Sequence, residues 1–324
     1  MNSKKKTGDY LMYHIVTHTD IDGVGSAALY IYLQGEKPEK IYFSEPYLID
    51  RTIKRLVGIR TDKIVFMDLG MNNSFYPLIS KSLEKIINRG IEVEWYDHHV
   101  WENEWINGMK AIGTKLYIDR STCATGVVAK YAPRKRVDVE QDFIDELVKG
   151  VCAGDLWKFD HWRGPWYLRL VRRREQNSWR LHVIDTLSQG ILWKNEFTEN
   201  IVAKLEKELK AYNDVIRNLY IRNINGLKIV YIPYNDLVDS SFMASLALGR
   251  ANADIAVIVS RDGKLSFRST GYNVRELAVK LGGGGHVKAS GAKIKIPFKV
   301  KMMSLWRIEY LLHYIHTLIE KIIR

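Results

Sequence analysis

The segment Ile91-Glu92-Val93-Glu94-Trp95-Tyr96-Asp97-His98-His99 decides the fold assignment of this chain. Apolar and polar residues alternate up to Tyr96, which predicts a half-buried β-strand. The carboxylate and two imidazoles that follow stand at the carboxyl end of that strand, where open α/β sheets place their binding crevice. Taken alone, the segment is also compatible with a solvated turn whose histidines have no role.

A second strand with acids at its end lies near the amino terminus. Leu11–Thr17 is a short apolar stretch, followed by His18-Thr19-Asp20-Ile21-Asp22-Gly23 and by helical spacing from about Gly25 to Leu33. Glycine and small residues permit a tight turn between strand and helix. Two carboxylates two residues apart, Asp20 and Asp22, repel each other unless water or a cation bridges them. We therefore expect a metal site at this turn.

The first part of the chain continues as alternating strands and helices. Further strands are predicted at Ile41–Phe43, Lys63–Met67 and Lys115–Ile118, and further helices at Leu48–Val57, Phe75–Asn88 (capped by Asn73 or Ser74), Ser121–Tyr131 and Gln141–Ala153. This alternation predicts an α/β fold with a doubly wound, mostly parallel sheet. Asp68 follows Met67, so three strand tips carry acids and should converge on one crevice. Asp155 is a fourth candidate ligand or, alternatively, an ordinary helix-end acid.

The remainder predicts a smaller α/β domain behind a helical connector. Asn195–Asn223 is a long charged helix, and Leu227–Ile232 begins a new series of strands and helices. The expected organisation is a catalytic domain at residues 1–194, a connector at 195–225, and a substrate-binding domain at 226–324. The last segment, Ser304–Arg324, predicts an amphipathic helix that packs on this domain.

A glycine run stands out in the second domain. Gly282-Gly283-Gly284-Gly285-His286 follows a helix predicted from about Val274 to Leu281. Glycine raises the entropic cost of ordering a chain, so packing is a poor explanation for four in a row. Their N–H groups can cradle an anion, with His286, Arg268 and Lys288 as further phosphate contacts. A flexible loop is the alternative.

Composition narrows the class of protein. The chain has 324 residues, 46% of them hydrophobic, and a formal net charge of +12, which suits an anionic partner. We see no signal peptide and no apolar run that could span a bilayer, so we expect a soluble cytoplasmic protein. Cys123 and Cys152 form no disulfide framework or zinc pattern, and we expect them to be reduced.

A segment rich in tryptophan and arginine lies between Trp157 and Trp193. Its members include Arg169, Arg172, Arg173, Arg174, Trp179 and Arg180. Aromatic rings interleaved with guanidinium groups suit base stacking and phosphate attraction. A helix with a solvated basic face and a tryptophan-rich underside is the alternative.

Nearly the whole chain resembles the DHH phosphoesterase family with its C-terminal DHH-associated domain. The resemblance rests on motifs in the family's order: His18-Thr19-Asp20-Ile21-Asp22-Gly23, Asp68-Leu69-Gly70, Asp97-His98-His99, Ser121-Thr122-Cys123-Ala124-Thr125-Gly126, Asp155 and Gly282-Gly283-Gly284-Gly285-His286. One departure is that many members carry a histidine four residues before the first acid. That position is Val16 here, and the histidine lies at His18, as in RecJ-type members.

The resemblance implies two Mn²⁺ ions, or Mg²⁺, in the N-terminal domain. Asp20 would bind one ion and Asp22 the other, Asp68 would bridge them, and His98 and Asp155 would complete the ligand set of the second ion. His99 would lie near the scissile phosphate, and Asp97 would orient a neighbouring imidazole. His18 is the third residue implied to take part in catalysis. The second domain would contact substrate through Gly283, Gly284, Gly285, His286 and Arg268.

The chemistry of these residues agrees with the resemblance. Carboxylate and imidazole ligands suit Mn²⁺. Two such ions lower the pKa of a bridging water and stabilise the attacking and leaving oxygens at phosphorus. Hydroxide would then attack the phosphate directly, without a covalent enzyme intermediate.

The implied activity is hydrolysis of short single-stranded RNA or DNA to mononucleotides, as in nanoRNase-like members. Alternatives are a RecJ-like exonuclease on longer strands and a hydrolase of cyclic dinucleotides or 3′-phosphoadenosine 5′-phosphate. Outside enzymes, a metal-free replication scaffold would be expected to have lost its ligands, whereas here all five are present. No membrane contact is expected, and a homodimer is left open.

Overall fold

The computed structural model describes residues 12–172 and 175–323. Arg173 and Arg174, part of the predicted nucleic-acid segment, lie outside these residues. The chain divides into two compact units, Met1–Lys194 and Asn195–Arg324.

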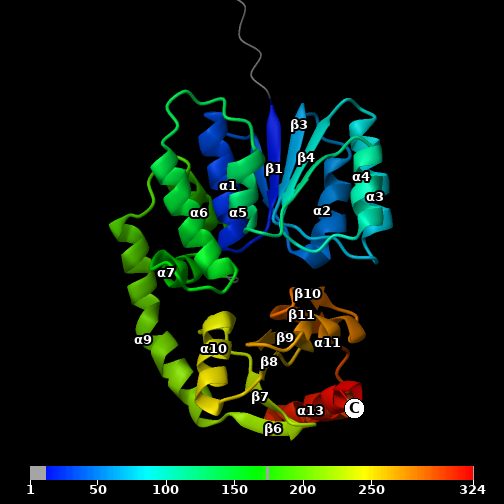
Figure 1. The fold of residues 1–324 in the computed structure, drawn as a ribbon, viewed down its shortest axis with the longest axis vertical. Helices are drawn as coiled ribbons and strands as arrows, with labels where there is room; N and C mark the ends of the chain where they lie inside the picture. Colours follow the sequence, from blue (N-terminus) through cyan, green and yellow to red (C-terminus); the bar gives the residue numbers. More distant parts are fainter. Residues whose placement is uncertain (1–11, 173–174, 324) are drawn as a thin grey trace, which may run out of the picture. The chain divides into compact units, whose positions relative to one another are not determined.

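The N-terminal unit is built on a five-stranded sheet. Its strands are β1 (Tyr13–Thr17), β2 (Lys40–Phe43), β3 (Lys63–Met67), β4 (Glu92–Asp97) and β5 (Lys115–Ile118). All pair in parallel, in the order β2-β1-β3-β4-β5; Figure 1 labels β1, β3 and β4. The predicted parallel sheet is therefore confirmed. The strand order reverses direction between β1 and β3, and doubly wound sheets open their crevice at that point, beyond the carboxyl ends of the strands.

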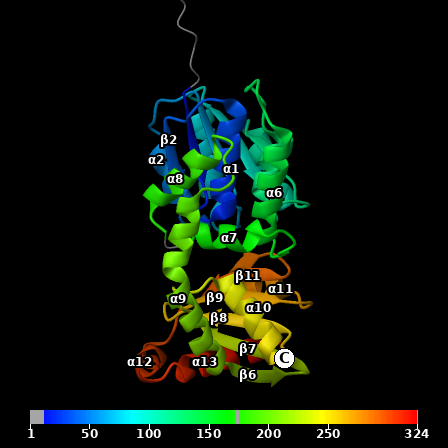
Figure 2. The same cartoon turned by 90° about the vertical axis from the view of Figure 1, so that its left-hand side faces the viewer.

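Helices cover both faces of this sheet. They are α1 (Ile21–Gln34), α2 (Ile49–Leu56), α3 (Tyr76–Ile87), α4 (Asn103–Ala111), α5 (Ala124–Tyr131), α6 (Gln141–Asp155), α7 (Arg163–Leu170) and α8 (Asn177–Leu187), with a 3₁₀ turn at Pro46–Leu48. Figure 1 shows α1, α5 and α6 on one face and α2, α3 and α4 on the other. Figure 2 shows α8 beside α1, with which it packs.

The prediction that Ile91–Tyr96 is half-buried is wrong, because both faces of β4 are covered. Glu94, which the alternation assigned to solvent, is only 3% exposed. Its carboxylate accepts hydrogen bonds from Lys63 Nζ at 2.9 Å, Tyr30 Oη at 2.9 Å and Tyr96 Oη at 3.0 Å. A buried carboxylate is tolerated when its charge is paired and its oxygens are hydrogen-bonded. This network explains a polar residue in the middle of a central strand.

Several helix starts differ from the prediction. Helix α1 begins at Ile21 because Asp20 caps it, with the carboxylate accepting from Gly23 N–H at 3.1 Å. Asp22 therefore lies inside the first helical turn instead of on a loop. At the start of α3, Asn72 Oδ1 accepts from Phe75 N–H at 3.1 Å, and neither Asn73 nor Ser74 makes the cap. Helix α4 was not predicted at all.

The expectation that both cysteines are reduced is also wrong. Cys123, just before α5, and Cys152, on α6, form a disulfide with a Cα–Cα distance of 5.2 Å. This distance is normal for a disulfide. The two residues are 29 positions apart in sequence, so only the packing of α5 against α6 brings them together.

We expect reduction of this disulfide to lower the thermal stability of the N-terminal unit. Releasing a crosslink between residues 29 positions apart should cost about 3.6 kcal/mol, and about 7–14 °C in melting temperature for a unit of this size. Differential scanning calorimetry with and without dithiothreitol measures the effect. The Cys123→Ala/Cys152→Ala variant is the control, since its melting should not respond to reductant. Equal melting of the wild type in both buffers would contradict the assignment.

The C-terminal unit contains a six-stranded mixed sheet. Its strands are β6 (Tyr220–Ile224), β7 (Leu227–Pro233), β8 (Ile255–Val259), β9 (Lys264–Ser269), β10 (Gly284–Gly285) and β11 (Ala289–Lys293). The order is β10-β11-β9-β8-β7-β6, and only the β7–β8 pair is parallel among the described strands. Its helices are α9 (Asn195–Arg217), α10 (Ser240–Ala251), α11 (Val274–Lys280), α12 (Phe298–Trp306) and α13 (Glu309–Ile323).

The core of this unit lies between one face of the sheet and two helices. Leu277 of α11 and Ile315 of α13 are buried against Tyr231, Val257 and Phe267 of the sheet. Helix α10 lies over β7, β8 and β9 (Figure 2). The predicted packing of the C-terminal helix on this unit is thus confirmed. The prediction is wrong in its length, because residues 304–306 belong to α12 and a separate helix, α13, begins at Glu309.

The helix predicted at Asn195–Asn223 also ends earlier than expected. Helix α9 stops at Arg217, and residues 220–224 form the edge strand β6. In the described part of the chain, no helix combines the length and apolarity needed to cross a membrane.

Candidate metal centre

The first candidate ligands stand between β1 and α1. His18 Nδ1 lies 2.8 Å from Asp20 Oδ2 and 3.3 Å from Asp68 Oδ2, which comes from the end of β3. Gly23 allows this turn to pack tightly, because a Cβ there would lie 2.5 Å from the carbonyl oxygen of His18. The turn and the first helical residues therefore hold His18 and Asp20 against the neighbouring strand tip.

The carboxylate of Asp22 is fixed by the start of another helix. The N–H groups of Ala124 and Thr125 donate to it at 2.7 and 2.8 Å, and Thr125 Oγ1 donates at 2.7 Å. These groups belong to the first turn of α5, and a helix N-terminus favours a negative charge. Each carboxylate oxygen has two lone pairs, so these bonds leave acceptor capacity for a cation.

Asp68 lies at the centre of the cluster. It follows β3 directly, is 1% exposed and has a φ of 54°, in the left-handed region that aspartate tolerates better than most residues. Its Oδ2 faces His18, and its Oδ1 lies 3.4 Å from His98 Nε2. One carboxylate therefore faces two groups of ligands.

His98 faces three carboxylates at once. Its Nε2 lies 3.4 Å from Asp68, 3.5 Å from Asp155 and 3.6 Å from Asp22. Asp155 is the last residue of α6, and its buried Oδ2 is the atom that faces His98 Nε2 at 3.5 Å; it makes no hydrogen bond among the described residues. A buried carboxylate oxygen of this kind is satisfied when it ligates a cation.

Asp97 and His99 form a pair at the edge of this cluster, with His99 Nδ1 4.0 Å from Asp68 Oδ1. His99 Nδ1 lies 2.7 Å from Asp97 Oδ1, and Trp101 Nε1 donates to Asp97 Oδ2 at 2.6 Å. Both carboxylate oxygens of Asp97 are thus engaged with neighbours. This arrangement suits a residue that orients His99.

Among the described residues of the N-terminal unit, three groups of ligand atoms share Asp68. His18, Asp20 and Asp68 form the first group, Asp22, Asp68 and His98 form the second, and Asp68, Asp97 and His99 form the third, with the candidate ligand atoms of each group within 4.8 Å of one another. Both carboxylate oxygens of Asp97 are engaged by His99 and Trp101, which leaves the first two as the candidate ion-binding groups. Asp155 adjoins the second group through His98. Oxygen and imidazole nitrogen donors around one bridging carboxylate fit a pair of divalent cations such as Mn²⁺.

The protonation of these residues supports a shared cation. Burial and the like charges of Asp68 and Asp155 raise the pKa of Asp22, and burial is the main cause that raises the pKa of Asp155 to about 6. Burial works against the charge of His98, but the surrounding carboxylates outweigh it and raise its pKa to about 11. The positive charge of His98 therefore offsets part of the negative charge of these carboxylates. A bound divalent cation would offset the same charge.

Residues that the sequence did not single out support the site. Glu45 Oε1 accepts from Thr19 Oγ1 at 2.7 Å, and Glu45 Oε2 lies 3.8 Å from His18 Nε2. Thr125 donates a hydrogen bond to Asp22, and Trp101 donates one to Asp97. No local pattern marks these positions, although Thr125 lies in the Ser121–Gly126 motif.

Arg180 belongs to this support and not to a nucleic-acid surface. It is 3% exposed, and its Nε donates to the carbonyl oxygen of Thr19 at 2.6 Å. Its guanidinium also donates to the carbonyl oxygens of Glu175 and Arg172. The prediction of base stacking at this position is therefore wrong, because the group is used to fix the His18–Asp20 turn.

The C-terminal unit brings its own candidate residues together. Arg268 pairs with Ala289 in the β9–β11 ladder, and Ala289 exchanges backbone hydrogen bonds with His286. Arg268 Nη2 also donates to Ser241 Oγ at 3.3 Å. Arg268 and His286 thus lie at the same end of the β9–β11 pair.

Close packing explains at least two glycines of the run, whereas we expected packing to be a poor explanation. A Cβ on Gly283 would lie 2.0 Å from the carbonyl oxygen of Gly291, and one on Gly285 would lie 2.6 Å from Ser290 Cα. The N–H groups of Gly282, Gly283 and His286 donate to Val279, Ala278 and Ala289. An anion cradle here would therefore depend on side chains and on the remaining N–H groups.

Two family models match the chain. The DHH family N-terminal domain matches residues 13–154, and the DHHA1 domain matches residues 227–304. The chain therefore belongs to the DHH phosphoesterase family and carries the C-terminal DHHA1 domain.

Individual proteins of known function are similar to the chain. The oligoribonuclease NrnB of Bacillus subtilis is 23% identical over 307 residues, which are 87% of this chain and 73% of NrnB. Exonuclease RecJ bound to manganese has a similar fold, with a TM-score of 0.55 and 14% identity over 88% of this chain and 86% of RecJ. A pGpG-specific phosphodiesterase, PggH of Vibrio cholerae, has a TM-score of 0.52 and 17% identity over 93% of this chain and 97% of its own. The two structural similarities concern the fold.

Proposed function

We propose that this phosphoesterase hydrolyses short oligonucleotides to mononucleotides with the help of two divalent metal ions. The observation that carries the proposal is the pair of ligand groups joined by Asp68. The similarity to NrnB, an oligoribonuclease, supports the substrate class. The assembled ligands favour an enzyme over a metal-free scaffold.

Two Mn²⁺ ions, or Mg²⁺, are the proposed cofactors. Asp20 and His18 would hold one, Asp22, His98 and Asp155 the other, and Asp68 would contact both. Bound ions supply an activated water and stabilise the charge that develops on the phosphoryl oxygens.

The neighbouring side chains would manage protons and position. Asp97 stabilises the charged form of His99 against the opposing effect of burial, so the pKa of His99 is raised. A protonated His99, held by Asp97 at Nδ1, would offer its Nε2 proton to a phosphoryl oxygen or to the departing hydroxyl. Trp101 keeps Asp97 in place for this role.

The C-terminal unit is proposed to bind the rest of the substrate. Arg268 and His286 share one end of the β9–β11 pair, and their side chains offer charge and hydrogen bonds to a phosphate. Gly283, Gly284 and Gly285 would contribute only those backbone N–H groups that are not already hydrogen-bonded within the unit. Cytoplasmic location stays a prediction from the sequence.

A length series tests the substrate class. We expect end-labelled single-stranded RNA of two to five nucleotides to be degraded at least tenfold faster than a strand of 40 in Mn²⁺, because a nanoRNase-like site accepts short ends. Equal or faster cleavage of the long strand would favour the RecJ-like alternative. Turnover restricted to 3′-phosphoadenosine 5′-phosphate or to a cyclic dinucleotide would favour a nucleotide hydrolase.

A further inference from the structure

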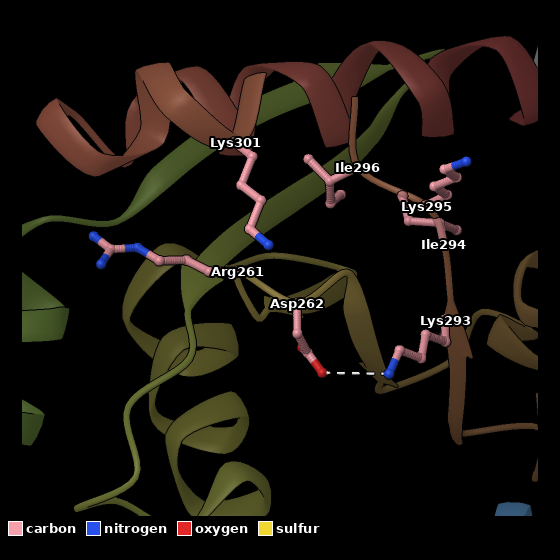
Figure 3. A pocket seen from close by; sticks show the side chains of 7 residues that line it. All are labelled: Arg261, Asp262, Lys293, Ile294, Lys295, Ile296 and Lys301. Atoms are coloured by element: carbon pink, nitrogen blue, oxygen red, sulfur yellow. Dashed lines mark ion pairs between the residues drawn. The ribbon is translucent and has the colours of Figure 1, made fainter. Parts of the chain in front are cut away.

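A basic pocket lies in the C-terminal unit, at the turn between β8 and β9. It has a volume of about 410 Å³ and is lined by Arg261, Asp262, Lys293, Ile294, Lys295, Ile296 and Lys301. The turn is fixed to the end of β11, since Ile294 N–H donates to the carbonyl oxygen of Gly263 at 3.0 Å. Figure 3 shows the Lys301 side chain extending from α12 toward the turn that carries Asp262. The pocket therefore joins three segments that are separate in the sequence.

The lining carries an excess of positive charge. Four cations and one carboxylate line the pocket, a difference of three positive charges. Asp262 lies 3.6 Å from Lys293 Nζ (Figure 3). Within the described residues, Arg261, Lys295 and Lys301 have no carboxylate at ion-pairing distance. These three groups are available to a polyanion from solvent.

Helix α12, which carries Lys301, also presents an apolar stripe to solvent. Phe298 is 77% exposed, Met302 46%, Leu305 60% and Trp306 88%. At 100° per residue these positions lie within about 100° of one another on the helix, opposite Val300 and Ser304, which face the unit's interior. Lys301 lies at the edge of the stripe. On the helix, the exposed ring of Phe298 therefore lies about 60° from Lys301, and that of Trp306 about 140°.

We propose that this pocket and the exposed stripe of α12 form a binding surface for single-stranded nucleic acid. Cations that contact the backbone beside aromatic rings on which bases stack are the features of sequence-independent single-strand binding. Charge complementarity favours this occupant, since three uncompensated cations face a strand with one charge per phosphate. A membrane is a weaker match, because the cations line a concavity formed partly by a β-turn and α12 has only nine residues.

The surface is distinct from the proposed Arg268–His286 contact. Both involve β9, but Arg268 stands near one end of this strand and Lys264, next to the turn, at the other. Four residues along a strand span about 14 Å. That distance corresponds to about four stacked nucleotides at 3.4 Å each. A stacked trimer, about 10 Å long, would not reach both contacts, whereas a 12-mer would. This inference rests on the proposed function, but it is tested by measuring RNA binding and does not require enzymatic activity.

The experiment measures binding of fluorescein-labelled oligoadenylate RNA to the full chain in EDTA, by fluorescence anisotropy across a KCl series. For a 12-mer, we expect Lys295→Ala/Lys301→Ala to weaken binding about tenfold and to lower the salt slope by about 1.4, since each lost phosphate contact removes about 0.7. Trp306→Ala should weaken binding about tenfold with an unchanged slope, because stacking releases no counterions. Trimer binding should stay the same in all variants.

The control is Lys207→Ala/Lys210→Ala, which removes two exposed cations from α9. It should leave the affinity and the slope for the 12-mer unchanged, which separates a local site from general charge. Wild-type affinity of both test variants for the 12-mer would overturn the proposal. If the test variants keep RNA binding but lose binding to phosphatidylserine vesicles, the stripe is assigned to a membrane. If they keep RNA binding but lose a dimer seen by light scattering, the stripe is assigned to a second copy of the chain. Because the assay contains no metal, an inert enzyme would leave its outcome unaffected.

Discussion

Asp68→Asn is expected to reduce oligonucleotide turnover by about a thousandfold or more, with little change in folding. Asp68 faces both ligand groups. The Asp68→Asn change replaces one carboxylate oxygen with an NH₂ group, which cannot bind a cation, in the residue that both groups share. Metal ions contribute several kcal/mol of transition-state stabilisation, and each 1.36 kcal/mol corresponds to a tenfold rate change. Initial rates with a labelled dinucleotide in Mn²⁺ measure the loss.

Asparagine is the suitable replacement because it keeps the shape of the side chain and tolerates the φ of 54° at this position. Asp119→Asn is the matched control. Asp119 also follows a parallel strand, β5, but it pairs with Lys130 at 2.7 Å and belongs to none of the ligand groups among the described residues. Its replacement should leave turnover within about twofold of wild type. Substantial activity in Asp68→Asn, with circular dichroism unchanged, would remove the basis of the two-ion proposal.

Adding Mn²⁺ to metal-stripped protein is expected to raise the melting temperature of the N-terminal unit by about 5–10 °C. Burial, and after it repulsion from neighbouring carboxylates, raises the pKa of Asp22 and of Asp155, so the charged forms of these two acids are costly until a cation binds beside them. A cation bound only by the folded state at a hundred times its dissociation constant stabilises by about 2.7 kcal/mol. For a unit of this size each kcal/mol is worth about 2–4 °C.

Thermal melting of chelator-treated protein, followed during a Mn²⁺ titration, measures this shift without reference to activity. Asp155→Asn should reduce the shift, because it removes a ligand whose Oδ2 has no hydrogen-bond partner among the described residues. Asp119→Asn again serves as the control and should show the full shift. A wild-type melting temperature that stays constant up to millimolar Mn²⁺ and Mg²⁺ would show that the cluster binds no divalent cation.

Local patterns were sufficient for most elements of the N-terminal unit. Lys63–Met67 and Lys115–Ile118 form strands with the predicted bounds, because an apolar run between polar segments leaves few alternatives. The reasoning failed where tertiary contacts outweigh the local pattern. Glu94 is buried by partners on other elements, and β6 follows a helix whose polar composition continues past its end.

The candidate site was predicted from the positions of acids at strand tips. Asp20 and Asp68 follow neighbouring parallel strands, and the carboxyl ends of such strands share one edge of the sheet. The sequence could not indicate which polar groups would hold these residues. Ala124 and Thr125 reach Asp22 across more than 100 positions, and Arg180 reaches Thr19 across 161.

The sequence by itself therefore determined the parallel architecture and the residue types that gather at its crevice, since hydrophobic periodicity and motif order are local properties. Only the tertiary structure decided that Asp68 faces both ligand groups, that Cys123 and Cys152 are joined, and that two glycines of the run serve packing. It also placed Lys301 beside the turn that carries Asp262. Each of these contacts joins residues distant in sequence, and their distance is set by how helices and strands pack.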